Sequence, residues 1–169
     1  RRPRRHRRQG ALPAAGPPAG VIGFVTSASG LFCNRKDKGA ETVKWTAAGS
    51  NMEVESFVAI GPRPSGSLAA EKAALHLVSR LTALGLEAQM DFFTNVTPSG
   101  AVVFRNVIGR VPGKGRGLIL LGAHYDTKAE VEGFVGANDS GSGVGVLLEL
   151  ARVLKSGPQV TPEIQFVFF

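Results

Sequence analysis

The spacing of apolar residues predicts one helix and then a pair of strands. From Leu68 to Leu84 apolar side chains recur at intervals of three and four residues, which places them on one helical face. Ser67 precedes this stretch as a helix-capping residue, and Gly85 follows it as a helix stop. Two strands are expected next, over 87–93 and 101–111, on either side of a turn that contains proline and glycine.

The remaining sequence predicts a strand–helix–strand unit. Residues 118–123 form a continuous apolar run, which is typical of a central strand covered on both faces. Residues 144–155 predict a second helix that ends before Gly157 and Pro158, and 164–169 predict a further buried strand. A helix that joins two neighbouring strands makes them parallel. The whole order of elements indicates an α/β domain.

Composition agrees with one folded domain and places the excess charge outside it. The chain has 169 residues, 43% of them hydrophobic, which is enough for one domain-sized core. The net charge of +7 is due to a basic arm, residues 1–8, that contains six arginines. Such an arm could bind nucleic-acid phosphates. With one Trp and one Tyr, however, the chain lacks aromatic residues for a nucleic-acid platform, and we expect no nucleic-acid partner.

Residues 1–51 are predicted to be a leader and linker, and residues 52–169 the folded domain. Residues 1–20 are rich in Arg, Pro, Ala and Gly and are expected to be disordered. The basic start and the apolar run at 21–28 have the order of a secretory signal. Prolines interrupt this region, so it does not predict a membrane span, which needs about 20 apolar residues.

The single cysteine excludes a disulfide framework and leaves two interpretations. Cys33 follows Gly30-Leu31-Phe32, which resembles a degraded bacterial lipobox, although Phe32 stands where a small residue is usual. In that interpretation a lipid on Cys33 attaches the protein to a membrane. In the other, Cys33 is an unremarkable linker residue. The leader favours a periplasmic, envelope-attached or extracellular protein.

Residues with metal-binding chemistry follow the strand predicted at 118–123. His124 and Asp126 stand at its carboxyl end, and residues two apart in extended chain point to the same side. Asp139 lies in a glycine-rich segment just before the second helix. Ligands of open α/β sheets bind outside the carboxyl ends of strands, and imidazole with carboxylate favours zinc. A hydrogen-bonded loop without metal is the alternative.

Three motifs of the sequence belong together. They are Gly61-Pro62-Arg63-Pro64-Ser65-Gly66-Ser67, His124-Tyr125-Asp126-Thr127 and Gly136-Ala137-Asn138-Asp139-Ser140-Gly141-Ser142-Gly143. This combination resembles the co-catalytic zinc aminopeptidases, a family that includes aminopeptidase Y-like enzymes, glutamate carboxypeptidases and the related glutaminyl cyclases. The resemblance runs from about Phe57 to Phe169. It implies a three-layer α/β/α sandwich with a mixed central sheet, of the zinc-exopeptidase type.

The resemblance implies a role for each residue of the cluster. His124 would be the histidine ligand of one zinc ion, and Asp139 the carboxylate that bridges two. Asp126 would be the catalytic carboxylate that supports the neighbouring ligand. Two zinc ions would activate a water and polarise the scissile carbonyl of a peptide substrate at its N-terminal residue.

The sequence departs from the family after the strand predicted at 164–169. There the family continues into an acidic segment with the general base and a further ligand, followed later by another acidic ligand and a histidine. None of these is found here, so we expect the N-terminal part of a metallopeptidase domain, incomplete and inactive alone. A glutaminyl-peptide cyclotransferase is the alternative. Typical cyclases use one zinc and carry Thr-Asp where Asn138 and Asp139 stand, so Asn138 favours a peptidase.

Two other polar residues are assigned to the surface of helices. His76 lies between core positions of the first predicted helix and is expected to be a partly exposed histidine rather than a ligand. Glu149 lies on the second and is expected on a solvated face.

Overall fold

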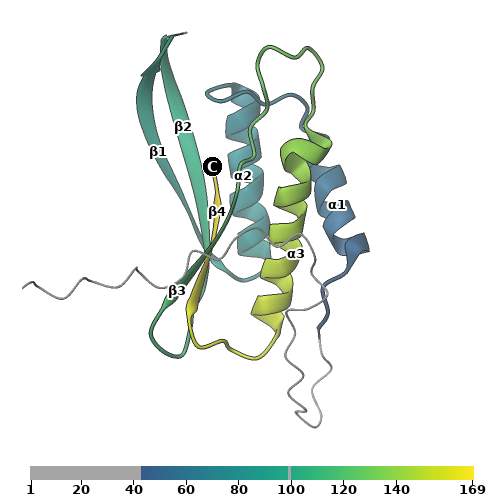
Figure 1. Cartoon of the computed structure of the whole chain (residues 1–169), viewed down its shortest axis with the longest axis vertical. Coiled ribbons are helices and arrows are strands. Elements are labelled where there is room, and N and C mark those ends of the chain that lie inside the picture. Colours follow the sequence, from purple (N-terminus) through teal and green to yellow (C-terminus); the bar gives the residue numbers. More distant parts are fainter. Residues whose placement is uncertain (1–42, 99) are drawn as a thin grey trace, which may run out of the picture. The chain divides into compact units, whose positions relative to one another are not determined.

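The computed structural model describes residues 43–98 and 100–169 (Figure 1). The predictions for the basic arm, the secretory signal and Cys33 lie outside these residues. No helix in the described ranges is long and apolar enough to cross a membrane. The elements are, in order, α1 (Ala47–Val58), α2 (Leu68–Ala83), β1 (Glu87–Thr97), β2 (Gly100–Val111), β3 (Leu118–Ala123), the short irregular helical segment η2 (Ala137–Ser142), α3 (Gly143–Ser156) and β4 (Glu163–Phe168).

The four strands form one mixed sheet in the order β1-β2-β4-β3. The pairs β1–β2 and β2–β4 are antiparallel, whereas β3 and β4 are parallel and are joined through α3. In this parallel pair Leu121 lies opposite Phe166, and Ala123 lies opposite Phe168. The predicted α/β class, the mixed sheet and the parallel strand–helix–strand unit are therefore confirmed.

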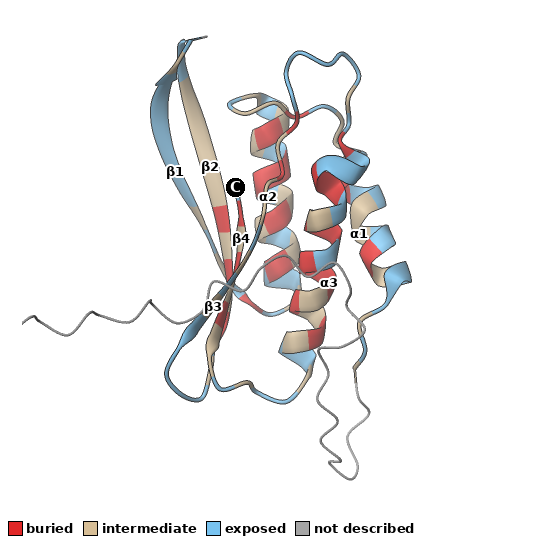
Figure 2. Cartoon of the chain, viewed as in Figure 1, coloured by how far each residue is buried: buried red, intermediate tan, exposed pale blue. Residues whose placement is uncertain are grey.

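The helices of the described chain cover one face of the sheet, so two of the three expected layers are present (Figure 1). On β4, Ile164, Phe166 and Phe168 are buried beneath the helices (Figure 2). On β3, which is an edge strand of this sheet, Leu118 is 51% and Leu120 60% exposed. The prediction that 118–123 is a central strand covered on both faces is thus wrong for the described residues. An apolar run does not reveal which of its faces has a partner.

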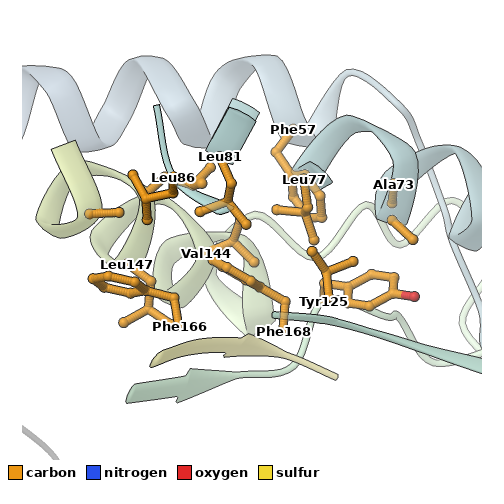
Figure 3. Close-up of a cluster of buried hydrophobic side chains, with 14 of the residues drawn as sticks. Phe57, Ala73, Leu77, Leu81, Leu86, Tyr125, Val144, Leu147, Phe166 and Phe168 are labelled. Carbon is orange, nitrogen blue, oxygen red and sulfur yellow. The ribbon is translucent and has the colours of Figure 1, made fainter. Parts of the chain in front are cut away.

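The core lies between the sheet and the two long helices α2 and α3 (Figure 3). Leu77 and Leu81 extend from α2 and Val144 from α3, and all three are fully buried with Phe166 and Phe168 of β4. Each such side chain contributes about 1.5–3 kcal/mol by leaving water. This cluster fixes α3 against β4, and with it the start of α3 beside the end of β3.

Helix α1 was missed by the sequence patterns, and the predicted domain boundary at 51/52 falls inside it. The helix begins after Thr46, whose Oγ1 accepts a hydrogen bond from the Gly49 amide (3.0 Å). Of its residues only Ser50 and Phe57 are buried, so it offers little apolar periodicity to recognise. It packs closely on α3, where a Cβ on Gly145 would overlap the backbone of Ser50.

Glu149 of α3 binds the start of α1. The prediction that it lies on a solvated helix face is wrong. The residue is 3% exposed. Its Oε1 accepts hydrogen bonds from the amide (3.0 Å) and hydroxyl (3.1 Å) of Thr46, and Arg152 donates to both carboxylate oxygens at 2.7 Å. These bonds, chiefly those from Arg152, keep the pKa of Glu149 below its ordinary value.

Lysine on the outer face of β4 should raise solubility without harming the core. Val167 points away from the helices and Phe169 is 55% exposed, next to the apolar outer face of β3. An uncovered apolar face of this kind favours aggregation. We expect the unmodified chain to be poorly soluble. The double variant Val167→Lys, Phe169→Lys should give more monomer in light scattering and keep its melting temperature.

The matched control is Phe166→Lys, which adds a charge of the same kind on the helix-facing side of β4. It should abolish cooperative thermal unfolding, because Phe166 is fully buried. Equal solubility of the parent chain and the double variant would contradict this account of the outer face.

Candidate functional site

The first site segment continues directly from β3. The Phe169 amide donates to Ala123 O (3.1 Å) and the Tyr125 amide donates to Phe169 O (2.9 Å), so the β3–β4 pairing extends past the end of both strands. His124 lies between these two bonded residues. Its backbone is therefore held by the sheet itself, at the carboxyl end of β3.

The second site segment folds back onto this end of the sheet through η2. A Cβ placed on Gly143, at the start of α3, would lie 3.2 Å from the Ala123 side chain, so α3 begins against β3. Gly136 has a left-handed backbone (φ 58°), and a Cβ there would overlap the Asp139 carbonyl oxygen. Asp139 itself is extended (φ −113°, ψ 92°), and the Gly141 amide closes the turn on Gly136 O at 2.9 Å.

The structure brings together the three residues that the sequence singled out. His124 Nδ1 lies 3.0 Å from Asp126 Oδ1, and His124 Nε2 lies 2.9 Å from Asp139 Oδ1. The imidazole is partly exposed and Asp139 is open to solvent. Behind them, the Ser65 hydroxyl donates to Asp126 Oδ2. The result is a continuous line, Ser65–Asp126–His124–Asp139, in which side-chain exposure rises from Asp126 through His124 to Asp139.

The polarity of this line suits a cation at its outer end. A neutral imidazole that donates its Nδ1 proton to Asp126 presents a lone pair on Nε2, and Asp139 presents only acceptors. Two facing acceptors at 2.9 Å need a shared proton or a metal ion. Imidazole nitrogen and carboxylate oxygen are zinc ligands, so Nε2 and Oδ1 fit that metal. Within 43–98 and 100–169, no three His, Cys, Asp or Glu side chains form a metal-binding group by themselves.

Two residues of the site, Arg63 and Ser65, had been assigned no role from the sequence. Both lie in the loop before α2, and the guanidinium of Arg63 is fully buried, 4.4 Å from the centre of the Phe57 ring. Burial lowers the pKa of Arg63, while the charge of Asp126 opposes that shift. An arginine between two prolines was visible in the first motif, but its burial was not. His76, by contrast, lies on α2 near Phe57, as a helical histidine outside the line.

A cavity of about 300 Å³ adjoins the line of polar residues. His124 and Asp126 form part of its wall, and Phe93, Phe104 and Phe169 give it an aromatic character. Tyr125 also borders it, with its phenol donating to the Arg105 carbonyl at 2.8 Å. The site thus combines candidate metal ligands with an apolar recess.

Comparison with known proteins shows which family this constellation resembles. Residues 106–169, which include His124, Asp126 and Asp139, match the model of peptidase family M28. This part of the chain is similar to the M28 peptidases. Together with the relatives described next, the match confirms the resemblance to zinc aminopeptidases and glutaminyl cyclases.

The curated relatives carry names of both kinds, cyclotransferase and aminopeptidase. Glutaminyl-peptide cyclotransferase-like protein of Bos taurus is 38% identical over 97 residues, covering 55% of this chain and 25% of the relative. Aminopeptidase YwaD of Bacillus subtilis is 50% identical over 52 residues, covering 31% of this chain and 10% of the relative. The chain therefore spans a quarter or less of these curated proteins.

The solved structures that resemble this chain also include both glutaminyl cyclases and exopeptidases. Porphyromonas gingivalis glutaminyl cyclase superposes with a TM-score of 0.68 at 34% identity, over 74% of this chain and 45% of that one. A Zn-dependent exopeptidase from Parabacteroides distasonis gives 0.66 at 28% identity, over 76% and 48%. The match of residues 106–169 to the M28 model supports a metallopeptidase-type function, and the cyclase matches fit the alternative equally well.

The single tyrosine offers a direct spectroscopic check of the folded site. Burial raises the pKa of Tyr125 to about 12. The phenolate absorbance of the native chain should therefore appear well above the ordinary pH of about 10, and in denaturant near it. Because the unfolded state loses this proton first, stability should fall as pH rises above about 10. A native midpoint near 10 would show that Tyr125 is solvated.

Proposed function

We propose that this chain supplies the first metal ligands of a zinc-dependent aminopeptidase of family M28. The observation that carries the proposal is the facing pair of acceptors, His124 Nε2 and Asp139 Oδ1, at the end of β3. Asp126 Oδ1 would accept a hydrogen bond from His124 Nδ1–H and so keep the imidazole in the tautomer that leaves Nε2 free to bind. Ser65 holds Asp126 in turn. Bound zinc would polarise the substrate carbonyl and lower the pKa of a water.

The proposed substrate is a peptide with a free N-terminus. Asp126 and Asp139 give the site negative charge close to the aromatic recess beside His124. A free α-amino group is positive at neutral pH, and the side chain next to it can enter an apolar recess. The name of the Bacillus relative, an aminopeptidase, agrees with this substrate class.

Cyclisation of N-terminal glutamine is the second candidate. It is favoured by the cyclotransferase name of the Bos taurus relative and by the Porphyromonas structure. Asn138, next to the candidate ligand Asp139, favours the peptidase. The two reactions leave different products, since hydrolysis frees an amino acid and cyclisation of glutamine releases ammonia.

Zinc binding is the first test. Competition with a chromogenic chelator should show weak binding by chain 1–169, because His124 and Asp139 supply only two ligands. His124→Ala and Asp139→Asn should each abolish it, and Asp126→Asn should weaken it by about 10–100-fold. The control is His76→Ala, which removes a histidine of α2 and should leave binding unchanged. Zinc binding that survives the loss of both His124 and Asp139 would refute the assignment.

Turnover separates the candidates. Chain 1–169 with added zinc should release no amino acid from amino-acid amides. The resemblance implies further metal ligands and a general base in addition to His124 and Asp139. Where the gene encodes sequence beyond Phe169, the longer polypeptide should free amino acids from peptides, and ammonia release from glutaminyl peptides would indicate the cyclase instead. Hydrolysis by chain 1–169 that Asp139→Ala abolishes would contradict the expected inactivity.

A further inference from the structure

Arg63 connects the two segments that carry the candidate ligands. Its Nε donates to Tyr125 O at 2.6 Å, beside His124. Its Nη1 donates to Val135 O at 2.6 Å, and its Nη2 donates to Gly136 O at 3.4 Å, in the segment that leads to Asp139. We propose that Arg63 is a positioning residue that sets the spacing between His124 and Asp139. This inference rests on the proposed metal site.

Burial of the guanidinium favours the arrangement in which both segments stay hydrogen-bonded to it. It is fully buried, and its hydrogen-bond acceptors are all backbone carbonyls, the fourth being Gly61 O at 3.2 Å. A buried charge is tolerated only while its donors are satisfied. If either segment moved away, N–H groups would remain unpaired in a place that water does not reach. The geometry of the site is thus maintained by the free-energy cost of leaving a buried cation without its hydrogen bonds.

The two segments do not depend on the guanidinium equally. The backbone of Arg63 is bonded to Thr127 at both ends, with the Arg63 amide donating to Thr127 Oγ1 (2.9 Å) and the Thr127 amide donating to Arg63 O (3.2 Å). These bonds remain whatever side chain stands at 63. The segment at 135–136 receives only side-chain donors from this residue. Loss of the guanidinium should therefore displace Asp139 and leave His124 in place.

Lysine cannot replace this arrangement although it preserves the charge. The three carbonyls at 125, 135 and 136 are reached by three different nitrogens of one planar group. An ammonium group is a compact point charge, and it cannot donate in the same spread geometry. Arg63→Lys is consequently a test of position rather than of charge.

The test combines zinc affinity with amide hydrogen exchange on chain 1–169. Arg63→Lys should weaken zinc binding by about 10–100-fold. Without zinc, the Gly141 amide, which donates to Gly136 O, should exchange faster by on the order of tenfold, whereas the Thr127 amide should keep its rate. The Phe166 amide in β4 reports global opening and serves as the reference.

Two control variants separate positioning from general destabilisation. Arg80→Lys makes the same chemical change at an arginine that pairs with Glu53 on α1, and should affect neither readout. Leu81→Ala removes a fully buried core side chain, and should speed all three amides alike while zinc affinity is retained below its melting temperature.

The outcomes distinguish this inference from the proposed function. Zinc affinity and Gly141 exchange in Arg63→Lys that match those of Leu81→Ala would overturn the positioning role. If the parent chain binds no zinc, the metal proposal fails, and selective exchange at Gly141 still decides whether Arg63 holds the segment.

Discussion

A buried guanidinium bonded to four backbone carbonyls constrains the functional end of this domain. Arg63 is out of reach of water, and its donors meet the loops at 61, 125 and 135–136. Residue 125 continues the β3–β4 pairing, but the loops at 61 and 135–136 are irregular, and no ladder of repeated hydrogen bonds holds them. The requirement to satisfy one cation replaces that ladder, because three separate stretches of chain must present their carbonyls to the same group.

The remaining order at the site comes from the strand–helix–strand unit. Parallel pairing of β3 with β4, and the packing of α3 on both, bring the start of α3 to the end of β3. This brings Asp139 near His124 but does not by itself fix the conformation of the loop between them. The apolar core therefore brings the two segments of the site together, and the directional hydrogen bonds of Arg63 set the spacing between His124 and Asp139. Apolar contact is non-directional, which is why both kinds of interaction are needed.

Sequence patterns predicted the parts of the fold that depend on periodic burial. Helix α2 and strands β3 and β4 show their apolar positions directly, and His124 and Asp139 were found because they lie at element ends. The role of Arg63 was not predictable from periodicity, because three of its four carbonyl partners lie more than 60 residues away in sequence. Helix α1 was missed for the same reason, since a polar contact rather than an apolar face defines its start.

The contact between Thr46 and Glu149 has a consequence for the order in which the chain can assemble during synthesis. The two residues are separated by 103 positions, and α1 buries few side chains of its own. A ribosome releases α1 long before it makes its partner on α3. Short helices without tertiary contacts are marginal in water. The first helix of the domain in sequence is thus among the last to become stable, and it completes the fold rather than starting it.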